Sequence, residues 1–358
     1  MSVHFHPLRV AAVERDADAL LLSLSLDGLD DAGRAAFRAS PGQYLTLRAE
    51  VGGEDLRRNY SICSGPAEPT LKVGIRHVPG GRFSGWAMNG ITAGQTLQVL
   101  PPEGRFVLTP DPSARRHVLC IAAGSGITPM LAILEALLAG EPNSRATLLY
   151  GNRTLGSTML REALAQLKNR HLGRLALHHV FSREAQDAAL YNGRLDQARV
   201  SEFLTSVVPV ASVDEAYVCG PAGMIDAACT ALAAAGLTAD KVHVERFGDG
   251  LPFPERSQAP APGDADHARI SLVIDGLARE FECRRDDPSI LDAGLRSGLE
   301  MPYACKAGVC STCRGRVLEG EVRMSRNFAL TDDEVAQGAV LCCQAHPLTP
   351  SVRITLDR

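Results

Sequence analysis

The sequence predicts a multidomain protein: an antiparallel β-barrel, then a doubly wound α/β domain, then an α+β domain built around a group of cysteines. Three observations predict this order. Short strand patterns separated by Gly, Pro and Asp fill the first hundred residues. Apolar strand and helix patterns alternate from His117 onward. Near the C-terminus, Cys305, Cys310 and Cys313 follow C-x4-C-x2-C spacing.

Length and composition exclude several classes of protein. A chain of 358 residues is long enough for roughly two or three domains. The net charge is −4, whereas a nucleic-acid-binding face is basic. No apolar run reaches the about 18 residues of a spanning helix, and the first residues lack the pattern of a secretory signal. We therefore expect a cytoplasmic protein with no nucleic-acid or membrane partner, whose ten cysteines are reduced, buried or metal-binding.

The cysteine loop Tyr303–Cys313 has the ligand spacing of a plant-type [2Fe–2S] cluster, whose fourth thiolate comes from elsewhere in the fold. Cys342 and Cys343 are both candidates for that ligand, because they are adjacent. Zinc would favour paired C-x2-C spacings, and a disulfide framework is uncommon in a large chain without a secretory signal. The loop therefore predicts a one-electron carrier, and the rest of the chain is expected to load and unload its electrons.

The barrel is predicted over residues 1–112, with candidate strands at Val10–Val13, Ala19–Leu24, Tyr44–Leu47 and Leu71–Ile75. Within it, Arg58–Ser64 indicates a flavin site. An Arg can pair with a pyrophosphate, a Tyr can stack on the flavin ring, and a Ser hydroxyl can hydrogen-bond near the reactive ring nitrogen. An ordinary strand with one aromatic is the alternative.

A second motif of the barrel, Gly80–Ser84, indicates a phosphate site. Its two glycines allow close backbone approach, and their N–H groups can cradle phosphate. Ser84 begins a predicted short helix that carries Trp86, for which we expect core packing.

The doubly wound domain is predicted over residues 113–253. The apolar run His117–Ala123 is typical of a buried parallel strand, and a helix is predicted over Met130–Ala139. Thr128 is its predicted N-cap, Pro129 its first residue, and Gly140 lies just past its end. Strand, Gly-rich turn and helix together predict a dinucleotide pyrophosphate at the helix N-terminus. Further strands are predicted over Ala146–Tyr150, Leu175–Phe181, Glu215–Cys219 and Val242–Glu245, and helices over Thr158–Lys168 and Pro221–Ala235.

Residues 254–267 are rich in Pro and Ala and predict an interdomain linker of moderate stiffness. The third domain is predicted over residues 268–358, where Asp275–Gly276 is a hairpin turn signal. Its predicted elements are strands over Arg269–Ile274, Arg279–Cys283 and Val352–Leu356, and a helix over Ser289–Ser297.

These motifs together resemble the ferredoxin–NADP reductase family joined to a C-terminal plant-type ferredoxin domain of the β-grasp fold. The resemblance covers nearly the whole chain. It rests on R-x-Y-S at Arg58–Ser61, on the Gly80–Ser84 motif, on G-x-G-I-T-P at Gly124–Pro129, on C-G-P-x-x-M at Cys219–Met224, and on the cysteine loop. It implies FAD, a dinucleotide, and a [2Fe–2S] cluster ligated by Cys305, Cys310, Cys313 and Cys343.

The resemblance also implies roles for individual residues. Ser61, Cys219 and Phe247 belong to the hydride path, with Phe247 covering the far face of the flavin. A buried strand thiol and a core aromatic are the alternatives for Cys219 and Phe247. The implied cofactor-binding residues are Arg58, Tyr60, Ser61, Gly80, Gly81, Arg82, Phe83, Ser84, Gly124, Gly126, Thr128, Arg153, Ser182, Arg183, Gly220 and Pro221.

The expected nucleotide is NADPH. Ser182 and Arg183 match the position where NADP-using members hold the 2′-phosphate, and Arg153 and Arg194 could add positive charge. An NAD enzyme more often places an acidic residue there. Solubilising surface arginines are the alternative.

The resemblance implies an electron-transfer subunit that serves an oxygenase. Within the family, the cluster domain is most similar to phenylacetyl-CoA epoxidase reductases, through Leu318–Met324, Asn327–Leu330 and Cys343–Pro347. We therefore expect a di-iron oxygenase partner and a role in phenylacetate degradation. Reductases of Rieske-type oxygenases such as 3-ketosteroid 9α-hydroxylase share the layout, as does phthalate dioxygenase reductase, which uses FMN. A non-catalytic redox sensor is an alternative of another class, and the intact hydride path argues against it.

Overall fold

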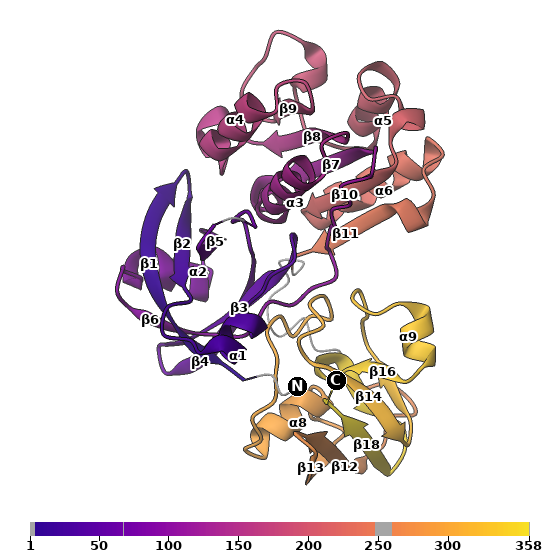
Figure 1. The fold of residues 1–358 in the computed structure, drawn as a ribbon. Coiled ribbons are helices and arrows are strands. Elements are labelled where there is room, and N and C mark those ends of the chain that lie inside the picture. The colour runs from indigo at the N-terminus through magenta and orange to yellow at the C-terminus, as the bar shows by residue number, and fades with distance from the viewer. Residues whose placement is uncertain (1–3, 67, 248–259, 358) are drawn as a thin grey trace. The chain divides into compact units, whose positions relative to one another are not determined.

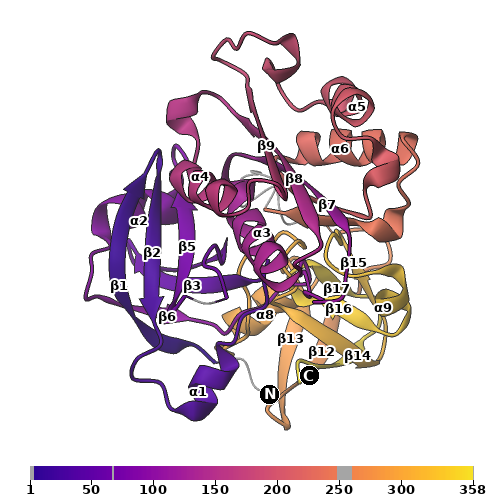
Figure 2. The ribbon, with the colours of Figure 1, turned by 45° about the horizontal axis from the view of Figure 1, so that its top comes forward.

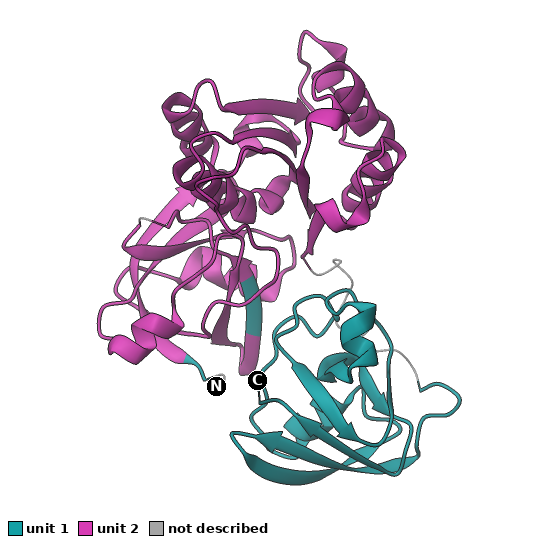
Figure 3. Ribbon diagram, turned by 45° about the vertical axis from the view of Figure 1, so that its right-hand side comes forward, with its two compact units in different colours: residues 1–5, 57–59, 248–358 teal, residues 6–56, 60–247 magenta. Residues whose placement is uncertain are grey.

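The computed structural model describes residues 4–66, 68–247 and 260–357. The chain divides into two compact units (Figure 3). One consists of residues 6–56 and 60–247, and the other of residues 1–5, 57–59 and 248–358. The first unit holds the predicted barrel and the predicted doubly wound domain.

The N-terminal part of the first unit is a six-stranded antiparallel sheet (Figure 1). Its strands are β1 (His6–Asp16), β2 (Ala19–Ser25), β3 (Tyr44–Val51), β4 (Glu54–Ser61), β5 (Thr70–Arg76) and β6 (Thr96–Val99). They lie in the order β4-β3-β6-β1-β2-β5, and a bridge from Ile62 to Val73 joins the end of β4 to β5, at the opposite edge of the sheet. This bridge brings the two edges together as in a barrel. Two helices accompany the sheet, α1 (Asp31–Ala36) and α2 (Arg82–Gly90).

The second half of this unit is a five-stranded parallel sheet flanked by helices. Its strands, β7 (His117–Ala123), β8 (Arg145–Asn152), β9 (Leu175–Phe181), β10 (Glu215–Gly220) and β11 (Val242–Arg246), lie in the order β11-β10-β7-β8-β9. The helices are α3 (Ile127–Gly140), α4 (Arg161–Arg170), α5 (Gln197–Ser206) and α6 (Ala222–Ala234). Because the chain leaves β7 toward β8 and later returns to β10 on the other side of β7, the order reverses between β7 and β10. This is the switch point where doubly wound sheets bind ligands.

Side-chain alternation along the strands explains why both faces of the parallel sheet are covered. Cys120, Leu148 and Tyr217 face a core shared with α3 and α4, whereas Leu119 and Val218 face a core shared with α5 and α6. Figures 1 and 2 show the two helix pairs on opposite faces of the sheet. Full burial of each such apolar side chain is worth about 1.5–3 kcal/mol before entropy is counted.

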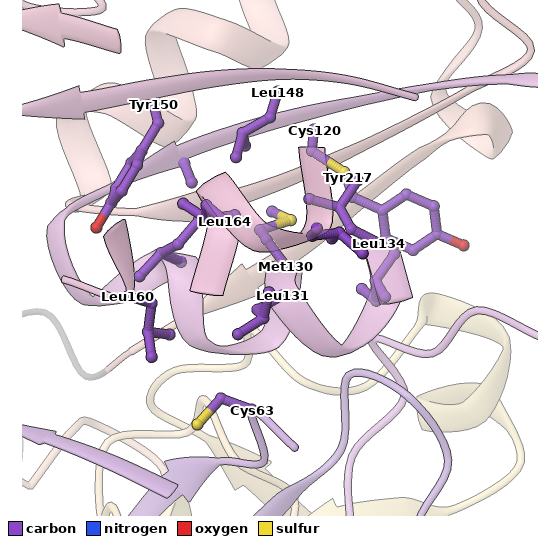
Figure 4. Close-up of a cluster of buried hydrophobic side chains, with 14 of the residues drawn as sticks. Cys63, Cys120, Met130, Leu131, Leu134, Leu148, Tyr150, Leu160, Leu164 and Tyr217 are labelled. Carbon is purple, nitrogen blue, oxygen red and sulfur yellow. The ribbon is translucent and has the colours of Figure 1, made fainter. Parts of the chain in front are cut away.

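Figure 4 shows how the first of these cores joins the two halves of the unit. Met130 and Leu134 of α3 face Cys120 and Tyr217 of the sheet, and Cys63 approaches from the barrel. Cys63 is 2% exposed, so the barrel contributes to the core of the parallel sheet. The barrel and the nucleotide half therefore share one continuous apolar cluster.

The start of α3 differs from the prediction. The helix begins at Ile127, with Gly126 as N-cap, so Thr128 lies inside the first turn and is not the cap. Residues Gly124–Gly126 form a 3₁₀ turn that runs directly into α3, and the Thr128 hydroxyl donates to the Ser125 carbonyl, 2.9 Å away. At the other end, Gly140 is the last helical residue.

In its described residues, the C-terminal unit is a mixed β-sheet with two short α-helices. Strands β12 (His267–Ile274), β13 (Leu277–Arg284), β14 (Arg314–Glu319), β16 (Ala339–Leu341) and β18 (Ser351–Thr355) lie in the order β13-β12-β18-β14-β16. Strands β15 (Val322–Met324) and β17 (Ala345–Pro347) pair separately, and the helices are α8 (Ile290–Arg296) and α9 (Asp332–Ala336). The two residues Asp275 and Gly276 join β12 to β13 with φ values of 55° and 73°, as a tight hairpin requires.

Part of the predicted linker packs on the C-terminal unit. Asp264 is paired with Arg323 at 2.5 Å, and Ala265 donates its N–H to the Pro347 carbonyl at 2.9 Å. The preceding stretch, residues 254–259, lies outside the described residues. Within the described part of the chain, no helix has both the length and the apolar character needed to cross a membrane.

Candidate functional site

Four thiols meet in the C-terminal unit. Cys305 forms side-chain hydrogen bonds with Cys310 and Cys343, and Cys343 also contacts Cys313. Backbone N–H groups point at these sulfurs: Ala307 donates to Cys305 Sγ at 3.3 Å, and Cys343 donates to Cys313 Sγ at 3.5 Å. This is the donor set of a [2Fe–2S] cluster, namely four thiols with N–H groups directed at sulfur.

The backbone of the cysteine loop is wound tightly. Lys306, Gly308 and Ser311 all have positive φ, at 49°, 75° and 53°. A Cβ on Gly308 would lie 3.0 Å from the Arg326 carbonyl oxygen, so a side chain there would press on the neighbouring segment. The loop therefore curls around its three cysteines, as the spacing predicted.

The structure distinguishes between the two adjacent cysteines that the spacing left open. Cys343 reaches the thiols of Cys305 and Cys313, whereas Cys342 lies fully buried in the apolar core of the unit. Burial raises the pKa of the Cys342 thiol to about 12, so it behaves as a neutral core residue. Among residues 4–66, 68–247 and 260–357, no three or more His, Cys, Asp or Glu side chains are grouped to hold a single metal ion.

In the barrel, three aromatic rings lie in a row. Tyr60 at the end of β4 is 5.7 Å from Phe83, and Phe83 is 5.3 Å from Trp86, between ring centroids. Trp86 also packs against the barrel core, as expected. The row leaves Tyr60 supported from one side by α2.

The Gly80–Ser84 motif forms the N-terminus of α2. Gly80 has φ of 72°, and Gly81 is the N-cap without a side-chain cap. The Ser84 hydroxyl accepts from Val78 N–H at 3.1 Å and donates to the Gly81 carbonyl at 3.4 Å, which fixes the turn. Arg82 pairs with Glu54, and this pair lowers the pKa of the exposed Glu54 carboxyl. An uncapped helix N-terminus beside an arginine suits a phosphate.

The residues expected on the hydride path converge around a carboxyl group that the sequence did not reveal. The Ser61 hydroxyl donates to Glu245 Oε2 over 3.1 Å. Glu245 on β11 is the register partner of Cys219 on β10. Phe247, two residues after Glu245, packs against the cluster that contains Cys219. Ser61, Cys219 and Phe247 are thus brought together, with Glu245 among them.

Both acidic groups at this point are held in their neutral forms by desolvation. Burial raises the pKa of Glu245 to about 8, although the hydrogen bond from Ser61 works in the opposite direction. Burial also raises the pKa of the Cys219 thiol well above its usual value. The sequence contained Glu245 at the end of a predicted strand, but nothing local linked it to a serine 184 residues away.

Glycines line the switch point between β7 and β10, because the backbone of the Gly-rich turn lies too close to the backbone of β10 to leave room for a Cβ. A Cβ on Gly126 would collide with the carbonyl oxygen of Cys219, and a Cβ on Gly220 would collide with Met224. Pro221 is the N-cap of α6, again without a side-chain cap. Gly124, Gly126, Gly220 and Pro221 therefore lie at the carboxyl ends of adjacent strands, where a dinucleotide can approach the backbone.

The residues expected to read the nucleotide follow β8 and β9. Ser182 N–H donates to the Asn152 carbonyl at 3.0 Å, and Arg183 N–H donates to the Arg153 carbonyl at 2.8 Å, so the two segments stay paired beyond the strands. Arg194 is exposed. Asn152 is 8% exposed, and neither polar atom of its side chain has a hydrogen-bond partner among the described residues.

Comparisons with known proteins agree with this arrangement. Residues 17–108 match the oxidoreductase FAD-binding domain, residues 120–230 the oxidoreductase NAD-binding domain, and residues 272–348 the 2Fe-2S iron-sulfur cluster binding domain. Over 99% of its length the chain is 44% identical to one of the subunits of 1,2-phenylacetyl-CoA epoxidase from Escherichia coli K12, covering 98% of that protein. Over 96% of its length it is 31% identical to the ferredoxin reductase component of 3-ketosteroid-9-alpha-monooxygenase from Rhodococcus rhodochrous, covering 94% of that protein.

Solved structures show the same fold. Phthalate dioxygenase reductase matches 98% of this chain and 98% of its own, with a TM-score of 0.58 and 22% identity. An intact type IV self-sufficient cytochrome P450 monooxygenase matches 98% of this chain with a TM-score of 0.69 and 25% identity, and there the chain spans 41% of the longer protein.

Fold and site define an oxidoreductase that uses FAD, NAD(P)H and a [2Fe–2S] cluster. The chain belongs to the ferredoxin–NADP reductase family whose members carry a C-terminal plant-type ferredoxin domain.

Proposed function

We propose that this chain is the reductase component of a multicomponent oxygenase, and that it delivers electrons from NADPH to the oxygenase. The observation that carries the proposal is the 44% identity, along 99% of the chain, to a component of 1,2-phenylacetyl-CoA epoxidase. The partner is then a di-iron oxygenase of the phenylacetyl-CoA epoxidase type, and the chain acts in phenylacetate degradation.

The C-terminal unit holds the cluster. Cys305, Cys310, Cys313 and Cys343 are its ligands, and the N–H groups directed at sulfur favour the negative charge of the thiolates. When bound, the flavin takes up the two electrons of a hydride together, and the cluster carries electrons one at a time. The residues of the chain hold these cofactors in position.

Residues of the barrel contact the flavin. The residues of the hydride path are positioned where the end of β4 approaches β10 and β11. Arg58 and Arg82 pair with the pyrophosphate, and Tyr60 stacks on the ring system. Ser61 lies beside the ring, and its hydrogen bond to Glu245 fixes the orientation of its hydroxyl. Neutral Cys219 lies beside the nicotinamide, and Phe247 shields the ring from water.

The nucleotide is NADPH. Gly124 and Gly126 admit the pyrophosphate to the start of α3. The 2′-phosphate is bound by Ser182, Arg183 and Arg153, because guanidinium groups match phosphate oxygens in geometry and charge. The pairing of the two segments beyond β8 and β9 supports this assignment.

We further propose three domains, over residues 1–112, 113–253 and 268–358, joined by the linker 254–267. None of the ten cysteines is paired in a disulfide, and four of them are the proposed cluster ligands, which favours the cytoplasm as the compartment.

Reconstitution tests the proposal. The purified holoprotein is mixed with a phenylacetyl-CoA epoxidase oxygenase complex, NADPH and phenylacetyl-CoA, and epoxide formation is measured. A Rieske-type 3-ketosteroid hydroxylase is assayed in parallel, because a reductase of that system is 31% identical. Coupled turnover with the epoxidase supports the proposal, whereas turnover with the Rieske enzyme alone contradicts it.

A further inference from the structure

Asp18 of the barrel binds two arginines at the edge of the nucleotide half. It lies in the turn between β1 and β2. Its Oδ2 accepts from Nε and Nη2 of Arg76, at 3.1 and 3.0 Å, and from Nη2 of Arg153, at 3.2 Å. Arg76 ends β5, and Arg153 follows β8, so one carboxylate joins the barrel to the nucleotide half.

The backbone fixes Asp18 in place. Ala17 has φ of 52°, and the Asp18 carbonyl accepts from His77 N–H at 2.8 Å. The carboxylate itself is poorly satisfied. Its Oδ1 lies 2.9 Å from Arg76 Nε but is buried without a hydrogen bond among the described residues, so a single oxygen serves both guanidinium groups. The backbone therefore places Asp18, and its Oδ2 is shared between the two guanidinium groups.

The two arginines lie where a nucleotide phosphate would arrive. A Cβ on Gly124 would collide with Nη1 of Arg76, so this guanidinium covers the first residue of the Gly-rich turn. Arg153 begins the segment that pairs with Arg183. The charges of Asp18, Arg76 and Arg153 sum to +1, and each guanidinium keeps N–H donors that Asp18 does not use. This surplus of charge and donors fits a phosphate ester.

A second observation at the same edge indicates a ligand. Asn152, directly before Arg153, is more than nine-tenths buried, and its amide has no partner within hydrogen-bond geometry among the described residues. The Tyr150 hydroxyl interacts with the Asn152 side chain, and it donates its own hydrogen to the Gly124 carbonyl, 2.9 Å away. Buried polar groups of this kind are normally fully hydrogen-bonded, and beyond the Tyr150 hydroxyl this amide keeps donor and acceptor capacity for a bound molecule next to the two arginines.

We propose that Asp18 is an internal competitor for the nucleotide: its carboxylate occupies Arg76 and Arg153, and a phosphate of the nucleotide displaces it on binding. The inference rests on the nucleotide role proposed above for Arg153. Asp18 is 35% exposed and Arg153 is 52% exposed, so the ion pair that must be broken is a weak one. Asp18 thereby sets how tightly the nucleotide is held.

The test is Asp18→Asn in the full-length holoprotein, which keeps the side-chain size and removes the charge. Anaerobic titrations followed by the flavin difference spectrum give Kd for NADP⁺, for 2′,5′-ADP and for ADP-ribose. The expected change is a Kd about two- to fivefold lower, the range that a half-exposed ion pair supports. Tighter 2′,5′-ADP with unchanged ADP-ribose identifies the 2′-phosphate as the competing group, and tighter ADP-ribose identifies the pyrophosphate. Unchanged or weaker binding of all three probes overturns the proposal.

Two further variants separate the possible failures. Asp55→Asn removes a carboxylate from Arg48 on the same barrel, 3.0 Å away, and is expected to leave every Kd unchanged. Arg153→Ala is expected to weaken nucleotide binding. In the double variant, Asp18→Asn should lower Kd by less than it does alone, because Asp18 and Arg153 act on the same phosphate contact. If Arg153→Ala has no effect, the proposed nucleotide role of Arg153 fails. If it weakens binding and Asp18→Asn brings no gain, only the competition fails.

Discussion

The hydroxyl of Ser61 and the carboxyl of Glu245 are 3.1 Å apart, although the two residues are 184 positions apart in the sequence. This hydrogen bond joins the last residue of β4 to β11 and sets both beside Cys219. The barrel and the nucleotide half therefore share a polar contact beside Cys219, in addition to the apolar cluster that joins them.

Glu245→Gln is predicted to make stability less dependent on pH. The carboxyl has a pKa of about 8 in the folded protein against an ordinary value of about 4.5, because burial disfavours its charge. Folding therefore takes up a proton between these values, and stability falls as pH rises from about 4.5 to about 8. Gln cannot ionise, so the Tm of the variant minus the Tm of the parent protein should increase as pH rises across this window. A Tm difference that stays constant from pH 5 to pH 9 would show that Glu245 does not titrate there.

The cluster ligands make a second prediction. Cys→Ser at position 305, 310, 313 or 343 should bleach the visible iron–sulfur absorption or sharply weaken it. FAD content should stay the same, because Tyr60, Ser61 and the Gly80–Ser84 motif lie in the other unit. Cys342→Ser is the matched control, since Cys342 is a core residue next to the proposed ligand. Loss of the cluster in the Cys342 variant and its retention in the Cys343 variant would reverse the assignment.

Nucleotide choice makes a third prediction. Arg183→Ala should raise the KM for NADPH and leave that for NADH nearly unchanged, because the guanidinium reads the 2′-phosphate that NADH lacks. Arg199→Ala, which removes an arginine paired with Glu202 on the surface of α5, should change neither. Equal losses for both nucleotides at Arg183 would mean that it does not contact the 2′-phosphate.

The close approach of Gly126 to β10 makes a fourth prediction. Gly126→Ala places a Cβ against the Cys219 carbonyl and should lower the free energy of unfolding by about 1–3 kcal/mol, as overpacking does. Gly223→Ala has open space around its Cβ and lies in α6, so it should be neutral or stabilising by up to about 1 kcal/mol. Denaturant unfolding monitors both. Equal stability of the two variants would show that the backbone of β10 can shift to accommodate a Cβ at position 126 without loss of stability.

Local patterns were sufficient to predict the order of the folds and the cysteine loop. The thiols at 305, 310 and 313 are close in sequence, so their spacing already limits the metal centre they can build. The apolar run of β7 and the glycines after it likewise predicted a buried parallel strand followed by a Gly-rich turn and a helix.

Contacts between distant residues could not be predicted in this way. Neither the partnership of Ser61 with Glu245 nor that of Asp18 with Arg153 leaves a local pattern, because each depends on how the barrel packs on the parallel sheet. The contacts of Cys343 with Cys305 and Cys313 could not be predicted from the spacing either, because Cys342 and Cys343 are adjacent in the sequence. The start of α3 was predicted too late in the sequence because a 3₁₀ turn continues into the helix without a side-chain cap.

The relay of electrons through the C-terminal unit is tested most directly by deleting residues 255–358. The truncated protein should fold as a flavoprotein and still reduce ferricyanide with NADPH, because that acceptor takes electrons from flavin. It should support no epoxidation of phenylacetyl-CoA by the oxygenase, whereas the full chain supports turnover under the same conditions. Epoxidation by the truncated protein at the full-length rate would contradict the account, because electrons would then reach the oxygenase without the cluster.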